Sequence, residues 1–166
     1  MTFTKKSNNR HNLKSTDLNE LEQYFCTAGE LPIATLTWFR GNYQNAASHV
    51  QRRVQVVLQQ NLWLTGRVTE QQQGNGGVRT MVLQYHADHD NNDDHWNLED
   101  YFFVLDPEAS PLCRNTPIET LGHLCFSKNL IFTNGSQEPL FRVLIVPCHK
   151  KPQTSFALIV ALSHLV

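Results

Sequence analysis

One histidine near the end of the chain, His164, stands where an imidazole could act as a base. It shares its side-chain phase with the alternating apolar residues of the segment 155–166, SFALIVALSHLV. Burial disfavours the charged form of an imidazole and lowers its pKa, and a neutral ring can accept a proton. His164 is therefore a candidate general base. The alternative is a core histidine whose ring is satisfied by a backbone carbonyl.

A second polar stretch, YHADHDNNDDHW at 85–96, is rich in metal-binding residue types. Four residues match ligand positions of a calcium loop: Asp88, Asp90, Asn92 and Glu99. The match fails at Asp93, where such a loop needs glycine for its sharp turn. Three histidines have spacings that fit no standard zinc set: His86, His89 and His95. We favour a solvated acidic loop over 88–99 and keep a calcium- or metal-binding module as the alternative.

Three other residue pairs offer weaker chemistry. Ser163 precedes His164, but neighbouring side chains of a strand point to opposite faces, so geometry excludes a serine nucleophile. Cys148 and His149 are neighbours at a loop edge, which is weak evidence for a cysteine nucleophile. The lysine pair at 150–151 is expected to be a solvated loop tip, or at best a weak contact for a phosphate-bearing cofactor.

Composition and charge indicate one globular domain. The chain has 166 residues, of which 40% are hydrophobic and 17% charged, enough apolar surface for a packed core. A formal net charge of -1 argues against a nucleic-acid or anionic-membrane surface. The longest nearly apolar run, 156–166, is too short to span a bilayer, and no secretory signal follows the basic N-terminus. The four cysteines have no close spacing, so we expect a cytoplasmic chain with free thiols.

The elements that must position His164 follow from hydrophobic periodicity. Helices are predicted near 18–25 and 45–60, the first with Asp17 and Glu20 as its capping pair. Strands are predicted over five segments: 31–40, 78–86, 101–106, 140–148 and 155–166. The segment 61–68 is predicted to leave the second helix and enter a further strand. The glycine-rich segment 71–77 is predicted to close a hairpin. We expect residues 1–16 to be a disordered lead-in and residues 17–166 to form one domain.

The last two strands are the clearest part of the pattern. A short loop between 140–148 and 155–166 predicts an antiparallel hairpin. Both faces of 155–166 are apolar, which predicts a strand in the middle of a sheet. The order of elements indicates an α+β fold with a mixed, mostly antiparallel sheet and helices packed on it. The sequence stops at Val166 inside this strand, so we expect a truncated subdomain whose exposed sheet edge could pair with a second chain. The alternative is that this strand, docked in its sheet, simply ends the domain.

Three segments, in sequence order, resemble the chloramphenicol acetyltransferase-like superfamily of CoA-dependent acyltransferases and condensation domains. They are the strand and helix within 31–60, the segment NLWLTGRV at 61–68, and the hairpin from PLFRV at 139–143 to SFALIVALSHLV, which precedes the family's HxxxD motif. The resemblance covers residues 17–166 and implies the N-terminal subdomain of that fold.

The resemblance places the family's catalytic base on His164, which would take a proton from a hydroxyl or amine acceptor that attacks an acyl thioester. It implies acyl-CoA, or a carrier thioester, as co-substrate, with no bound cofactor and no metal. The motif's aspartate would fall four residues after His164, beyond Val166, and Ser163 stands where the family often has a second histidine. We therefore expect an acyltransferase-like domain that is inactive as this fragment. A non-catalytic binding module of the same fold is the alternative.

Overall fold

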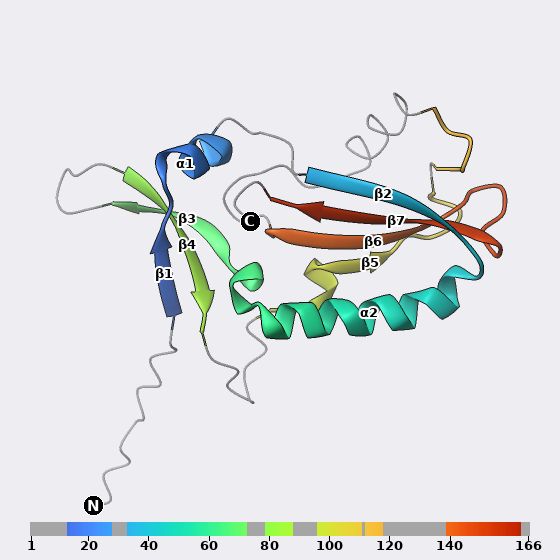
Figure 1. Ribbon diagram of the computed structural model, residues 1–166, viewed down its shortest axis with the longest axis horizontal. Coiled ribbons are helices and arrows are strands. Elements are labelled where there is room, and N and C mark those ends of the chain that lie inside the picture. Colours follow the sequence, from blue (N-terminus) through green and yellow to red (C-terminus); the bar gives the residue numbers. More distant parts are fainter. Residues whose placement is uncertain are drawn as a thin grey trace, which may run out of the picture.

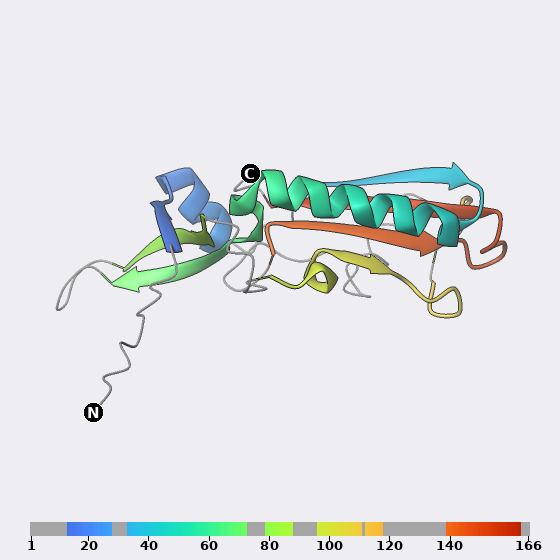
Figure 2. The ribbon, with the colours of Figure 1, turned by 90° about the horizontal axis from the view of Figure 1, so that it is seen from below.

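The computed structural model describes residues 13–27, 33–72, 79–87, 96–110, 112–117 and 139–163. These residues form one sheet of three strands and one of four, with a long helix lying along the larger sheet (Figure 1). The two sheets follow one another along the long axis of the molecule (Figure 2). Strand pairing is antiparallel in all but one of the described pairs, so the predicted α+β class with a mixed, mostly antiparallel sheet is confirmed.

The larger sheet contains the predicted hairpin at its centre. In spatial order its strands are β2 (Ile33–Arg40), β7 (Ser155–Leu162), β6 (Phe141–Pro147) and β5 (Phe102–Val104). β7 pairs antiparallel with both of its neighbours, and β5 pairs parallel with β6. Ala157 and Ala161 are fully buried and Ile159 is 1% exposed. The prediction of a central strand, covered on both faces, is therefore confirmed.

The side chains of β6 and β7 alternate between two hydrophobic clusters. The cluster on one face joins these strands to α2 (Tyr43–Gln60): Phe141, Val143, Ile145 and Phe156 pack with Val54 and Leu58. The cluster on the other face joins them to the segment after β5: Leu144, Val146, Ala157, Ile159 and Ala161 pack with Leu112. Fully burying one large aliphatic side chain is worth about 1.5–3 kcal/mol. The β6–β7 hairpin gains this burial energy on both of its faces and therefore contributes much of the stability of the larger sheet.

α2 begins directly after a sharp turn at the end of β2. Gly41 has a φ of 129°, a backbone conformation that favours glycine. The Asn42 side-chain oxygen then accepts hydrogen bonds from the backbone N–H groups of Gln44 and Asn45, at 2.8 and 3.1 Å. This cap satisfies two donors that have no partner within the helix. The helix therefore starts at Tyr43, two residues before the predicted boundary.

The segment 61–68 was predicted to leave the helix and enter a second strand, and it does so through an intervening helical turn. Leu62–Thr65 form a 3-10 helix, η1, and β3 (Arg67–Gln72) begins only after Gly66. The Thr65 hydroxyl donates to the Leu62 carbonyl at 2.7 Å and closes this turn. Gly66 has an ordinary φ of -68°, but a Cβ there would lie 2.7 Å from the Gln84 carbonyl oxygen. Glycine is needed because the backbone of the next strand comes so close.

The smaller sheet has the order β1 (Leu13–Asp17), β4 (Arg79–His86), β3, and both pairings are antiparallel. The register of β3 with β4 confirms the predicted hairpin, whose connection 73–78 lies outside the described residues. β1 includes residues 13–16, so the predicted disordered lead-in of 1–16 is too long. Every side chain of β1 is exposed, and backbone pairing with β4 forms the strand. Periodicity therefore carries no signal for it.

The helix α1 (Glu20–Thr27) is capped by residues other than the predicted pair. The Asn19 N–H donates to the Glu22 carboxylate at 2.7 Å, and the Glu22 N–H donates to the Asn19 side-chain oxygen at 3.0 Å. This reciprocal arrangement is a capping box shifted by two residues from Asp17 and Glu20. Asp17 cannot take that role because it belongs to β1, where it pairs with Val82.

A buried tyrosine links the two sheets. Tyr101 lies between the short helix η2 (Leu98–Asp100) and β5, and it is fully buried. Its hydroxyl donates to the Thr65 carbonyl at 3.0 Å and accepts from Arg67 Nη1 at 2.7 Å. Burial raises the pKa of Tyr101, although the nearby Arg67 guanidinium works in the opposite direction.

Candidate functional site

The predicted base, His164, lies outside the described residues, but the strand that leads to it is well defined. Leu162, the last residue of β7, is paired with Ile33 on one side and Phe141 on the other. Ser163 follows; its N–H donates to the Leu140 carbonyl at 2.8 Å, and the residue is 2% exposed. The backbone is therefore held in place up to the residue before the predicted base.

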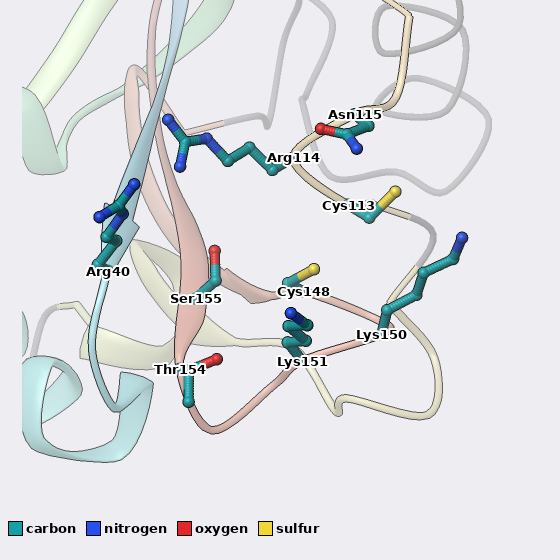
Figure 3. Close-up of a pocket in the computed structure, with 9 residues that line it drawn as sticks. All are labelled: Arg40, Cys113, Arg114, Asn115, Cys148, Lys150, Lys151, Thr154 and Ser155. Carbon is teal, nitrogen blue, oxygen red and sulfur yellow. The ribbon is translucent and has the colours of Figure 1, made fainter.

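The described residues also form a pocket of about 480 Å³ at the opposite end of β7. Its lining comes from three segments: the end of β2, the segment 112–117, and the β6–β7 turn with the start of β7 (Figure 3). The lining residues are Arg40, Cys113, Arg114, Asn115, Cys148, Lys150, Lys151, Thr154 and Ser155. We call this the basic pocket. Ser155 and Leu162 are seven positions apart, which is about 23 Å along an extended strand.

The turn between β6 and β7 forms one wall of the basic pocket and is held by backbone hydrogen bonds. Cys148 N–H donates to the Ser155 carbonyl at 2.9 Å, and Lys151 N–H donates to the Cys148 carbonyl at 3.0 Å. Gly41 N–H donates to the Thr154 carbonyl at 2.9 Å and ties the turn to the end of β2. These bonds fix the backbone from which the two lysines project.

The segment 112–117 forms the opposite wall. His149 N–H donates to the Leu112 carbonyl at 2.9 Å, and Leu112 is fully buried in the cluster beneath the sheet. Cys113 N–H donates to the Thr116 hydroxyl at 2.9 Å, while Thr116 N–H donates to the Cys113 carbonyl at the same distance. The wall is therefore a closed turn anchored by a core leucine.

The charges of the basic pocket are all of one sign. Arg40, Arg114, Lys150 and Lys151 line it, and no aspartate or glutamate of the described part of the chain does. None of these four side chains forms an ion pair with a carboxylate of the described residues. Figure 3 shows Arg114 extending from its loop toward the strands, while Lys150 extends from the turn away from Thr154 and Ser155.

The two thiols of the pocket differ in environment. The Thr116 hydroxyl, 3.4 Å from Cys113 Sγ, lowers the pKa of Cys113, and the positive charge of Lys150 contributes in the same direction. Cys148 is 5% exposed. Burial shields the Cys148 thiol from substrates, so the structure does not strengthen the weak sequence evidence for a nucleophile at Cys148.

The remaining sequence candidates have different outcomes. The segment 88–95 lies outside the described residues, so the solvated acidic loop stays a prediction and calcium binding stays its alternative. Elsewhere, within the described ranges, no group of three His, Cys, Asp or Glu residues could hold a metal ion. Arg142 of β6, which is not one of the candidates named above, lies with its guanidinium carbon 5.1 Å from the centre of the Phe103 ring, a cation–π contact. In the same ranges, no helix is long and apolar enough to cross a membrane.

Comparison with known proteins gives a likeness in structure. No family model matches the chain, and no curated protein matches its sequence. The crystal structure of F. graminearum TRI101 complexed with ethyl coenzyme A is similar, with a TM-score of 0.55 and 14% sequence identity. The likeness covers 92% of this chain and 35% of that one, so the chain spans about a third of its neighbour's length.

The fold is chloramphenicol acetyltransferase-like. This confirms the fold predicted from the segments 31–60, 61–68 and 139–166. In this fold the basic pocket could not be anticipated from the sequence, because Arg40, Arg114 and Lys150 lie far apart in the chain. The register that places Arg40 opposite Ser155 is what brings them together. The one signal the sequence offered was the lysine pair 150–151.

Proposed function

We propose that this chain is the N-terminal part of an acyltransferase-like domain that transfers an acyl group from acyl-CoA to a hydroxyl or amine. The observation that carries the proposal is the central, doubly covered β7, whose continuation leads to His164. The likeness to a structure that holds ethyl coenzyme A supports a thioester as the donor. The likeness covers 35% of that neighbour, and we propose that the complete activity requires residues beyond those in this sequence.

We infer a direction for the His164 imidazole from the alternation of side chains along β7. Phe156, Leu158, Val160 and Leu162 all pack on the α2 side of the sheet. If the alternation continues by one step, His164 lies on that side too, at the end of the apolar face. An imidazole at such an edge is partly removed from water, which keeps it neutral and able to accept a proton.

In the proposed reaction His164 takes the proton from the acceptor hydroxyl or amine as its oxygen or nitrogen attacks the thioester carbonyl. A bond forms between the acceptor and the acyl carbon, and a tetrahedral intermediate carries the negative charge on the former carbonyl oxygen. When the intermediate collapses, the carbon–sulfur bond breaks and the coenzyme A sulfur leaves. The imidazolium returns its proton to that sulfur, so the base is regenerated.

A test of this proposal compares two histidine variants in the longest natural reading frame that contains the chain. His164→Gln should lower the turnover number for acyl transfer by at least 100-fold, because general-base catalysis contributes about 10²–10⁴-fold. His149→Gln is the matched control, since it removes an exposed imidazole from the β6–β7 turn. Release of free coenzyme A thiol measures the rate. Equal activity in the two variants would exclude His164 as the base.

A non-catalytic interaction module of the same fold is the second candidate, and the outer strand β2 favours it. β2 pairs with β7 alone among the described strands, and its Ile33 and Phe39 are 53% and 41% exposed. An apolar edge strand is a template for pairing with a second chain. Light scattering during size-exclusion chromatography distinguishes the candidates. A concentration-dependent dimer that Ile33→Lys disrupts would support the module, and a monomer at all concentrations would contradict it.

A further inference from the structure

The basic pocket concentrates positive charge in a chain whose formal net charge is -1. Its four cationic side chains come from three segments that the fold brings together: Arg40 from β2, Arg114 from the segment 112–117, and Lys150 and Lys151 from the β6–β7 turn. Each segment is tied to the sheet or to its neighbour by backbone hydrogen bonds. The cations are therefore attached to a fixed frame.

Like charges that share one concave surface repel each other, and no carboxylate of the described residues relieves that repulsion. An anion bound among them would remove this cost and gain several charge-assisted hydrogen bonds. Arginine offers a planar pair of donors that matches phosphate oxygens, and lysine offers a compact point charge. Two hydroxyls and one amide in the lining, those of Thr154, Ser155 and Asn115, add neutral donors.

We propose that the basic pocket binds the phosphate groups of a small phosphorylated molecule. Its volume of about 480 Å³ lies in the range of small-molecule sites, and its walls are built in advance of binding. The four cations line one concave pocket, a shape that suits a compact anion better than the extended backbone of a nucleic-acid chain. A ligand carrying at least two negative charges matches the four cations better than a singly charged one.

The site is separate from the proposed acyl-transfer centre and does not depend on it. The pocket lies at the start of β7, and the predicted base follows the far end of that strand, about 23 Å beyond Ser155 at Leu162. The strand between them is paired on both sides. A ligand in the basic pocket therefore has no contact with the group that would act on the thioester.

Binding can be measured by titration calorimetry with inorganic pyrophosphate at low ionic strength. The double variant Lys150→Gln/Lys151→Gln and the single variant Arg114→Gln should each weaken binding by at least tenfold. These side chains are exposed, so their replacement leaves the core intact. The matched control is Lys14→Gln/Arg79→Gln. It also removes two positive charges, but from the smaller sheet, and this variant should bind pyrophosphate like the natural chain.

Cys113 gives an independent readout because it lines the same pocket. Bound pyrophosphate should slow alkylation of Cys113 by iodoacetamide at least fivefold, and the protection should disappear in the Lys150→Gln/Lys151→Gln variant. Three results would each overturn the proposal: no binding at millimolar pyrophosphate, equal weakening in the control variant, or sulfate binding as tightly as pyrophosphate. The last would show attraction of any anion by net local charge.

Discussion

Replacing Tyr101 with phenylalanine tests how the two sheets are joined. The change removes a single oxygen from a fully buried side chain and leaves the ring in place. The edge-to-face contact with Trp96, at 6.0 Å between ring centres, is retained. Two hydrogen bonds are lost: the one donated to the Thr65 carbonyl at 3.0 Å and the one accepted from Arg67 at 2.7 Å.

The expected loss of stability follows from the type of each bond. A hydrogen bond to a charged group contributes about 1.5–3 kcal/mol and a neutral one about 0.5–1.5 kcal/mol. Arg67 keeps its bond to the Gly66 carbonyl at 3.1 Å and its ion pair with Asp100 at 3.4 Å, so its charge is not left without partners. We therefore expect Tyr101→Phe to lower the free energy of unfolding by about 2–3 kcal/mol. For a domain of this size that corresponds to a melting temperature lower by about 4–12 °C.

Urea unfolding followed by circular dichroism measures the change, with Tyr43→Phe as the matched control. Tyr43 is 9% exposed, and its hydroxyl has no hydrogen-bond partner within the described residues. Its replacement should cost less than about 0.5 kcal/mol. If Tyr101→Phe costs no more than Tyr43→Phe, the hydroxyl does not join the sheets and the reasoning fails.

The pH dependence of the same variant provides a second check. Burial raises the pKa of Tyr101 above its ordinary value of 10.0, so the folded chain keeps this proton when the unfolded chain has lost it. The resulting stability is fully present below pH 10.0 and is lost as the pH rises through the raised pKa. Tyr101→Phe should therefore show a shallower decline at alkaline pH than the natural chain.

Two further substitutions and one measurement of thiol reactivity test other parts of the structure. Gly66→Ala should destabilise by about 1–3 kcal/mol in urea unfolding, because the new Cβ would lie 2.7 Å from a backbone oxygen of β4; an unchanged midpoint would show that β4 can move away. Asn42→Ala should cost about 1 kcal/mol through loss of the helix cap, and Asn42→Asp should restore it. Cys113 should react with iodoacetamide at lower pH than an ordinary thiol, while Cys148 stays protected by burial; equal rates in peptide mapping would contradict this.

The sequence predicted those elements whose side chains are sorted by burial. β7 is apolar on both faces and lies in the centre of its sheet, and α2 turns Val54 and Leu58 toward the core. The elements that were missed are held by the backbone instead. β1 has no buried side chain and pairs with β4 through its backbone, and the Gly66 N–H donates to the Trp63 carbonyl at the end of η1, so hydrophobic periodicity reports neither.

The helix caps show a subtler limit of sequence reasoning. The pairs Asp17–Glu20 and Asn19–Glu22 both have the spacing of a capping box, so spacing alone cannot choose between them. The choice is made by β4, because its pairing with β1 extends the backbone through Asp17. A tertiary contact thus decides a local feature, and the helix starts later than its own residues indicate.

The basic pocket lies at the start of β7, and the chain leads on from the far end of β7 to the proposed base. The packing of β7 therefore bears on how the two ends of this strand could influence each other. Transmission through β7 would require it to slide or tilt between two arrangements. Such a movement would break pairing with β2 and β6 and disturb the clusters on both faces. Close-packed interiors resist continuous deformation. The two ends are therefore expected to bind their ligands independently, with β7 as a rigid spacer between them.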